Sequence, residues 1–187
     1  ELWDDSLVDP DNRRPVDFPT RRDLLAGLQQ RAAEGLIPLV QELLAQWWDG
    51  RIKLYMTSQA LRCRRTHLAL FRDGDYLPLS SIGPRRDHVV AFARRRETTW
   101  ALVVVPRLLS RLSARGTPPV GQQVWGRDTL LLPPAAPLHW HNVLTGEALT
   151  ASGTPPAQGL SLAQIFQHVP VALLTNSPSP TQATDAA

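Results

Sequence analysis

DHVVAFARR (residues 87–95) and TTWALVVVPRLL (residues 98–109) are two apolar runs rich in β-branched and aromatic residues. Such residues are typical of strands. Further runs of this kind, with turn residues between them, follow along the chain: LALFRDGDYLPLSS (68–81), VGQQVWGRDTLLLP (120–133), PLHWHNVLTGEAL (137–149) and VPVALLT (169–175). About six short strands at this spacing predict an antiparallel sheet or sandwich. SLAQIFQH (161–168) is expected to form one helical turn before the last strand.

Before residue 68, the apolar residues recur at helical spacing. TRRDLLAGLQQRAAE (20–34) predicts a helix with Thr20 as its N-cap and Gly35 as its end. LIPLVQELLAQWW (36–48) predicts a second helix closed by Asp49 and Gly50, and IKLYMTSQALRCRRTH (52–67) a third. The sequence therefore indicates an α+β chain, in which helices precede an antiparallel β-domain.

The change of period divides the chain into three predicted parts. Residues 1–65 contain a polar loop of about eighteen residues and the helices, and residues 66–176 contain the strands. Residues 177–187 have the Ser, Pro and Thr content typical of a disordered tail. The helical stripes require a partner surface, because an amphipathic helix must bury its apolar side.

Composition narrows the classes of partner. Hydrophobic residues make up 43% and charged residues 20% of the 187 residues, as in soluble globular proteins, and no apolar run is long enough to span a membrane. The arginines occur as scattered pairs, which disfavours a nucleic-acid partner. The single Cys63 excludes an internal disulfide and favours the cytoplasm.

The polar loop at the start carries the best candidates for chemistry. It contains Glu1, Asp4, Asp5, Asp9, Asp11 and Asp17. Paired carboxylates can hydrolyse glycosides, but no apolar pocket is evident that would shift their pKa values. With neighbouring Asn and Arg they suit the positioning of sugar hydroxyls. A network of Asp and Arg that only rigidifies the loop is an equal alternative.

Other residues predict neither a metal site nor a cofactor. His139 and His141 could share one side of a strand, but no third ligand stands at zinc-like spacing. Cys63 has no placed His partner and is expected in the core. The sequence also lacks the glycine motifs of nucleotide-binding loops.

Several motifs together resemble the C-terminal portion of maltooligosyltrehalose synthase, a family of the α-amylase superfamily. They are ELWDDSLVDPDNRRPVDF (1–18), DGRIKLYMTSQALRCRR (49–65), ALFRDGDYLPL (69–79), DHVVAFAR (87–94), ALVVVPRL (101–108), VWGRDTLLLP (124–133), NVLTGE (142–147) and PVALL (170–174). The resemblance implies that residues 1–18 leave the last strand of a (β/α)8 barrel, whose active site lies at that end. The helices to residue 65 would close the barrel, and the rest would form a sandwich-like antiparallel β-domain.

The resemblance also implies an activity. The family is an isomerase that converts the reducing-end α-1,4 linkage of a maltooligosaccharide to an α,α-1,1 linkage by intramolecular transglycosylation. Its catalytic carboxylates would lie upstream, in the missing N-terminal barrel of the same polypeptide, so no catalytic residue is expected in this chain. The isolated chain is then expected to be inactive. The residues expected to bind substrate, near the reducing-end glucose, are Asp9, Asp11, Asn12, Arg13 and Arg14.

Two alternatives remain open at this point. The chain could be a non-catalytic β-module that binds glucan or a protein partner. It could also be part of another hydrolase or transferase of the α-amylase superfamily.

Overall fold

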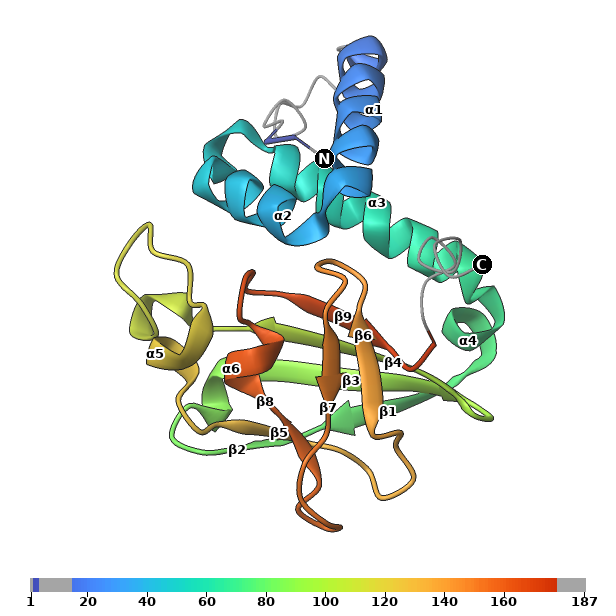
Figure 1. Ribbon diagram of the computed structural model, residues 1–187, viewed down its shortest axis with the longest axis vertical. Helices are drawn as coiled ribbons and strands as arrows, with labels where there is room; N and C mark the ends of the chain where they lie inside the picture. Colours follow the sequence, from blue (N-terminus) through green and yellow to red (C-terminus); the bar gives the residue numbers. More distant parts are fainter. Residues whose placement is uncertain (1, 4–14, 178–187) are drawn as a thin grey trace.

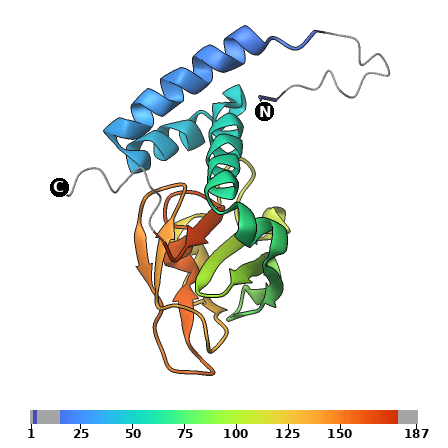
Figure 2. The ribbon, with the colours of Figure 1, turned by 90° about the vertical axis from the view of Figure 1, so that its right-hand side faces the viewer.

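The structure, a computed structural model, describes residues 2–3 and 15–177 of the chain. Figures 1 and 2 show helices α1–α4 (residues 18–73, here the helical layer) on one side of the antiparallel strands of residues 75–177 (the sheet region). This agrees with the predicted class of helices followed by an antiparallel β-domain. None of the helices in the described part is long and apolar enough to cross a bilayer.

Helix α1 (Phe18–Glu34) begins three residues earlier than the sequence predicts. Asp17 is its N-cap, and the carboxylate Oδ1 of Asp17 accepts the backbone N–H of Thr20 at 3.0 Å. The prediction of Thr20 as the cap is therefore wrong, because Asp17 satisfies the free N–H groups of the first turn and Thr20 lies inside the helix. Gly35 ends α1 as predicted, with a φ of 151°.

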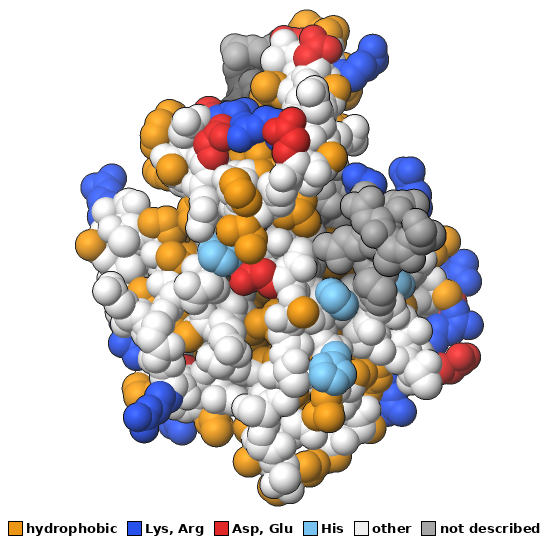
Figure 3. Space-filling model, in the orientation of Figure 1, with side chains coloured by type: hydrophobic (Ala, Val, Ile, Leu, Met, Phe, Trp, Pro, Cys, Tyr) orange, Lys and Arg blue, Asp and Glu red, His pale blue; other side chains and the backbone are white. Residues whose placement is uncertain are grey.

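Helices α2 (Leu36–Ala45) and α3 (Arg51–Thr66) are joined by the 3-10 turn η2 (Trp47–Asp49). Gly50 follows with a φ of 78°, a left-handed conformation that suits glycine. The three long helices share a small core whose buried helical members are Leu28, Leu39, Val40, Leu43, Leu54 and Tyr55. Arg31 of α1 pairs with Glu42 of α2, and Figure 3 shows acidic and basic side chains side by side on this layer.

A fourth helix, α4 (Leu68–Asp73), replaces a predicted strand. A short apolar run fits a helix as well as a strand, so periodicity alone could not decide. Packing decides here, since Leu70 is buried and Arg94 of the sheet region donates to the carbonyl oxygen of Phe71 at 3.0 Å. The change from helix to strand therefore comes after Asp73, later than predicted.

The larger sheet is antiparallel throughout, in the order β1-β3-β4-β9-β6-β7. Its strands are β1 (Asp75–Leu79), β3 (Val89–Arg96), β4 (Thr99–Pro106), β9 (Ala172–Thr175), β6 (His139–Asn142) and β7 (Ala148–Thr150). The stretches DHVVAFARR and TTWALVVVPRLL form β3 and β4, as predicted. These two strands pair along eight residues, with Ala93 opposite Leu102. Trp100, Leu102 and Val104 alternate along β4 and are all buried.

A smaller antiparallel sheet consists of β2 (Ser81–Ile82), β5 (Thr129–Leu131) and β8 (Gly159–Ser161). Its Leu130 and Leu160 belong to the same core as Leu102 and Trp140 of the larger sheet. Four short helical turns lie between the described strands: η3 (Arg86–His88), η4 (Leu109–Arg111), α5 (Gly121–Trp125) and α6 (Leu162–Ile165).

Helix α6 confirms the predicted helical turn, whereas α5 corrects a predicted strand in VGQQVWGRDTLLLP. Only Thr129–Leu131 of that stretch forms a strand. Trp125 explains the helix, because its ring stacks on Phe166 and its indole N–H donates to the carbonyl oxygen of Pro119 at 2.7 Å. A buried Trp needs such an acceptor for its N–H.

Candidate functional site

The predicted substrate-binding residues, Asp9, Asp11, Asn12, Arg13 and Arg14, lie outside the described residues. Residues 2–3 and 15–17 are the described residues closest to them in sequence. The indole N–H of Trp3 donates to the carbonyl oxygen of Trp47 at 2.6 Å, and Lys53 Nζ lies 5.2 Å from the centre of the Trp3 ring. A Cβ at Gly50 would stand 2.8 Å from the backbone nitrogen of Trp3, so glycine allows this close approach.

Asp17 anchors the other side of the polar loop. Its carboxylate accepts both the backbone N–H of Thr20 and the Thr20 hydroxyl, at 3.0 and 2.6 Å. These two hydrogen bonds lower the pKa of Asp17. The polar loop thus enters and leaves the described structure on the helical layer, through Trp3 and Asp17.

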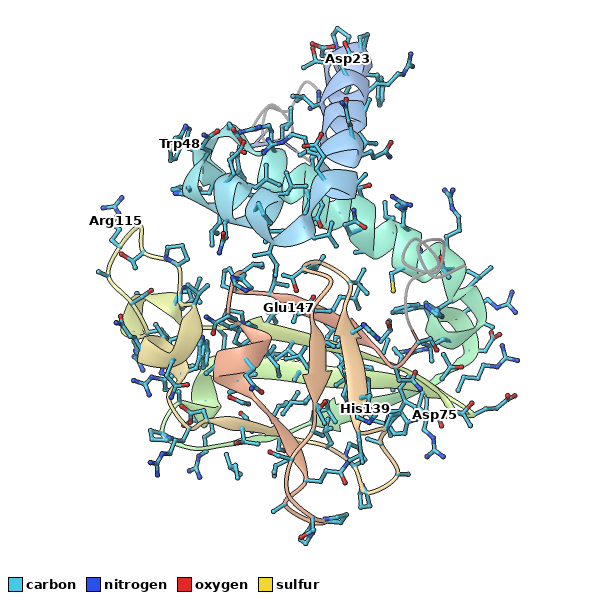
Figure 4. All side chains as sticks on the ribbon, viewed as in Figure 1. Asp23, Trp48, Asp75, Arg115, His139 and Glu147 are labelled. Carbon is cyan, nitrogen blue, oxygen red and sulfur yellow. The ribbon has the colours of Figure 1, made fainter. Side chains whose placement is uncertain are left out.

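Two aromatic side chains stand on the surface beside Trp3. Trp47 is 47% exposed and meets Trp3 edge to face, while Trp48 is 65% exposed and points away from the molecule (Figure 4). The structure places both of these adjacent residues outside the core.

A cleft of about 700 Å³ lies between the helical layer and the sheet region. The helices contribute the end of α1, the start of α2 and the second half of α3, and the sheet region contributes β6 and the turn that follows it. Its polar and titratable lining residues are Gln29, Gln59, Arg62, Cys63, Thr66, His67, His141, Asn142 and Thr145. No carboxylate occurs among the described residues that line it.

Burial shifts two of the titratable groups in this cleft. It lowers the pKa of the His67 imidazole, and it raises the pKa of the Cys63 thiol to about 11. Both shifts favour the neutral form, because burial disfavours charge. Arg62 forms no ion pair or hydrogen bond with the described part of the chain.

The turn between β6 and β7 connects the cleft to the helices. The Tyr55 hydroxyl of α3 donates to the carbonyl oxygen of Leu144 at 2.7 Å. His168 Nδ1 lies 3.2 Å from the amide nitrogen of Gln41 in α2, and His168 Nε2 lies 3.2 Å from the Glu147 carboxylate. Figure 4 shows Glu147 directly beneath the helices. Two hydrogen-bonded bridges therefore hold the sheet region against the helical layer.

The remaining candidate residues lie on β6, on α3 and before β5. His139 and His141 alternate with the buried Trp140 on β6, and the described residues contain no cluster of three or more metal-ligating side chains. Cys63 is buried, as the sequence predicts. Asp128 is fully buried and accepts the backbone N–H of Arg85 at 3.0 Å, which holds the turn before η3 in place.

Sequence reasoning missed the cleft, because its polar residues come from segments up to about a hundred residues apart. Arg62, His67 and Asn142 carry no local motif that could have indicated a shared site. Only the packing of the helices on the β6–β7 turn brings them together.

Comparison with known proteins shows which proteins this chain resembles. No protein-family model matches the chain. Two proteins from different strains of Mycobacterium tuberculosis, each named "Putative maltooligosyl trehalose synthase", are 41% identical over 174 residues, 93% of this chain. A similar solved structure, that of a mutant maltooligosyltrehalose synthase from Arthrobacter ramosus, is 31% identical over 92% of the chain with a TM-score of 0.63.

The chain is related to the maltooligosyltrehalose synthases. It spans 17% of the length of the two mycobacterial relatives and 18% of the Arthrobacter protein. The resemblance to a C-terminal portion of maltooligosyltrehalose synthase is thereby confirmed. Because the matches cover more than nine-tenths of the chain, the similarity to maltooligosyltrehalose synthases includes both the helical layer and the sheet region.

Proposed function

We propose that this chain is the C-terminal part of a cytoplasmic maltooligosyltrehalose synthase, an isomerase that acts on the reducing end of maltooligosaccharides. The observation that carries the proposal is 41% identity over 93% of the chain to proteins of that name, together with a structural neighbour of the same name. Identity at this level across both regions goes beyond a shared fold.

The proposed reaction moves one glycosidic bond within a single substrate. A carboxylate attacks the anomeric carbon of the penultimate glucose, while a carboxylic acid protonates the departing O4 of the terminal glucose. The terminal glucose stays bound and turns, and its anomeric hydroxyl then attacks the glycosyl-enzyme. The attacking hydroxyl loses its proton to the former acid, and an α,α-1,1 bond replaces the α-1,4 bond. Water must be kept out, since it would hydrolyse the glycosyl-enzyme.

This chain's own contribution is to substrate position rather than to bond cleavage. We assign no catalytic residue to it and place the carboxylates in the N-terminal barrel of the same polypeptide. Asp9, Asp11, Asn12, Arg13 and Arg14 would form one wall near the reducing-end glucose, because their donors and acceptors match sugar hydroxyls. The described residues that flank residues 4–14, through Trp3 and Asp17, form hydrogen bonds with the helices.

The proposal includes an architecture for the whole enzyme. Residues 1–65 would complete a (β/α)8 barrel, residues 66–176 would form a sandwich-like C-terminal β-domain, and residues 177–187 a tail. Exposed apolar side chains on the helical layer, such as Phe18 and Trp48, support a further packing partner.

The test compares the complete gene product with the isolated chain, each incubated with maltohexaose. We expect the complete product to remove reducing ends at unchanged substrate mass, and the isolated chain to do nothing. New reducing ends with shorter products would instead identify a hydrolase. No change in either sample would favour a binding module without chemistry.

A pair of arginine variants tests the role of the polar loop. Arg13→Met in the complete product should raise KM for maltohexaose about tenfold or more, because one charge-assisted hydrogen bond to substrate is lost. Arg115→Met is the matched control, since Arg115 stands on an exposed loop of the sheet region in Figure 4. Equal KM values for both variants would contradict the assigned wall.

A further inference from the structure

The cleft between the helices and the β6–β7 turn has the size and shape of a ligand site. Its volume of about 700 Å³ falls in the range typical of small-molecule pockets. One wall is apolar and consists of Ala32, Ala33, Leu36, Ile37 and Pro38. The other lining residues supply amides, hydroxyls, imidazoles and one guanidinium, and a mixture of apolar surface and a few polar groups is usual in such pockets.

The charge of the cleft has one sign. The guanidinium of Arg62 contributes a positive charge, and the described lining contains no Asp or Glu to neutralise it. On the β6–β7 side, the carboxylate closest in sequence to the lining residues is that of Glu147. It pairs with His168 and accepts a hydrogen bond from the Thr145 hydroxyl. The carboxylate nearest along the chain from the helical side is Glu34, which acts electrostatically on Arg31.

Two further polar features belong to the cleft. The first turn of α2 lies in the wall with no side-chain cap at its N-terminus, and the last turn of α1, whose free carbonyl groups carry the opposite partial charge, lies beside it. The Nδ1 atom of His141 is buried and has no hydrogen-bond partner among the described residues, although most buried polar atoms have one.

We propose that this cleft is a binding site for a small phosphorylated molecule, with Arg62 as the residue that holds the phosphate. Arg62 supplies the charge-assisted hydrogen bonds that a guanidinium forms with phosphate. The amides of Gln29 and Gln59 are available for the hydroxyl groups of the rest of the ligand. The site is separate from the polar loop, and the inference does not rest on the proposed transglycosylation.

A neutral glucan is the less suitable occupant. Sugar rings are commonly bound by stacking on aromatic side chains, and the described lining contains no Trp, Tyr or Phe. An unpaired arginine in a partly closed cleft gains more from an anion than from a hydroxyl, since charged hydrogen bonds are about twice as strong as neutral ones.

The experiment measures binding by calorimetry to the complete gene product at low ionic strength. Three probes separate the two parts of the ligand: inorganic phosphate, glucose 6-phosphate and maltose. We expect glucose 6-phosphate to bind more tightly than inorganic phosphate, and both to weaken as salt is added. Failure of either phosphate probe to bind would overturn the proposal.

Variants assign any binding to this cleft. Arg62→Met should weaken glucose 6-phosphate binding about tenfold or more, while maltose binding elsewhere in the protein stays unchanged. Arg64→Met is the matched control, because Arg64 lies two positions further along α3 and does not line the cleft. Equal binding by wild type and Arg62→Met would overturn the proposal.

Maltose supplies the opposite outcome. Maltose binding that Arg62→Met abolishes, without binding of glucose 6-phosphate, would identify a neutral sugar site in this cleft. This outcome would overturn the inference whatever the fate of the proposed transglycosylation.

Discussion

The helical layer and the sheet region bury their apolar residues very differently. The core of the sheet region contains nineteen buried residues, including Trp100, Trp125 and Trp140. The core of the helical layer contains seven, and one of these, Val169, comes from the sheet region. The buried core of the sheet region therefore consists of its own residues, whereas the core of the helical layer includes a residue from the sheet region.

Exposed apolar residues follow the same division. Phe18, Trp48 and Leu61 of the helical layer are each more than half exposed, and the sheet region has only Tyr76 above that level in the described chain. A layer with a small core and an apolar surface is expected to open more easily than one with a large core. The predictions below test this difference, from the largest expected effect to the smallest.

Trp140→Ala should have the largest effect, because Trp140 is fully buried in the larger core. Removal of a buried Trp side chain costs about 3–5 kcal/mol. Native-state hydrogen exchange of the complete gene product should show faster exchange in β3, β4 and β9, and also in the helices that rest on Val169. Trp48→Ala, with its exposed side chain, should change the exchange free energy by less than about 0.5 kcal/mol.

Leu39→Ala should weaken only one of the two regions. Leu39 is 1% exposed in the small helical core, so its truncation should cost about 2–5 kcal/mol there. Amide exchange should accelerate in α1–α3 while β3 and β4 stay protected. Leu61→Ala on the exposed side of α3 is the control. Equal acceleration in the sheet would show that the two regions unfold as one unit.

Tyr55→Phe should loosen the contact between the regions without unfolding either. The variant removes the donor to the carbonyl oxygen of Leu144 and leaves that oxygen without this partner, which costs about 1–3 kcal/mol. Exchange should accelerate in α3 and in the β6–β7 turn alone. Tyr76→Phe is the matched control, because Tyr76 is exposed on β1. A uniform change across the chain would contradict a local bridge.

Asp17 should give the smallest effect, confined to the first turn of α1. Its pKa is lowered by the Thr20 hydrogen bonds, so the cap stabilises α1 at pH values above the unfolded pKa of about 3.9. That stabilisation is lost as the pH falls through the lower, folded pKa. Protection factors at the start of α1 should fall accordingly.

Two variants separate the cap from its charge. Asp17→Asn should keep much of the protection, because Asn is also a good N-cap, but lose its pH dependence. Asp17→Ala should lose both. A pH dependence that persists in Asp17→Asn would assign it to another group.

Much of the fold could be predicted from local patterns. The β-branched and aromatic run around Val104 indicated strands, and the spacing of Leu39, Val40 and Leu43 indicated a helix. The errors fall where a short apolar run suits both states, as at Leu70 and Trp125. There, packing against Arg94 of β3 and against Phe166 decided between helix and strand.

The candidate sites could likewise be predicted only where their residues are neighbours in sequence. The polar loop with Asp9 and Arg13 could be singled out from composition and resemblance, because its residues are neighbours in sequence. The cleft around Arg62 could not, since its walls meet only after α3 packs on the β6–β7 turn. The pairing of Tyr55 with Leu144 across that junction is invisible in the sequence for the same reason.

The sequence by itself determined that helices precede an antiparallel β-region, and it determined the relationship to maltooligosyltrehalose synthases. These properties depend on side-chain periodicity and on residue identity along the chain, which are local. Only the tertiary structure decided which core is large, how the two regions hold together, and that Arg62 faces a cleft without a described carboxylate. Burial and electrostatics depend on distances in space, and residues far apart in sequence acquire those distances only on folding.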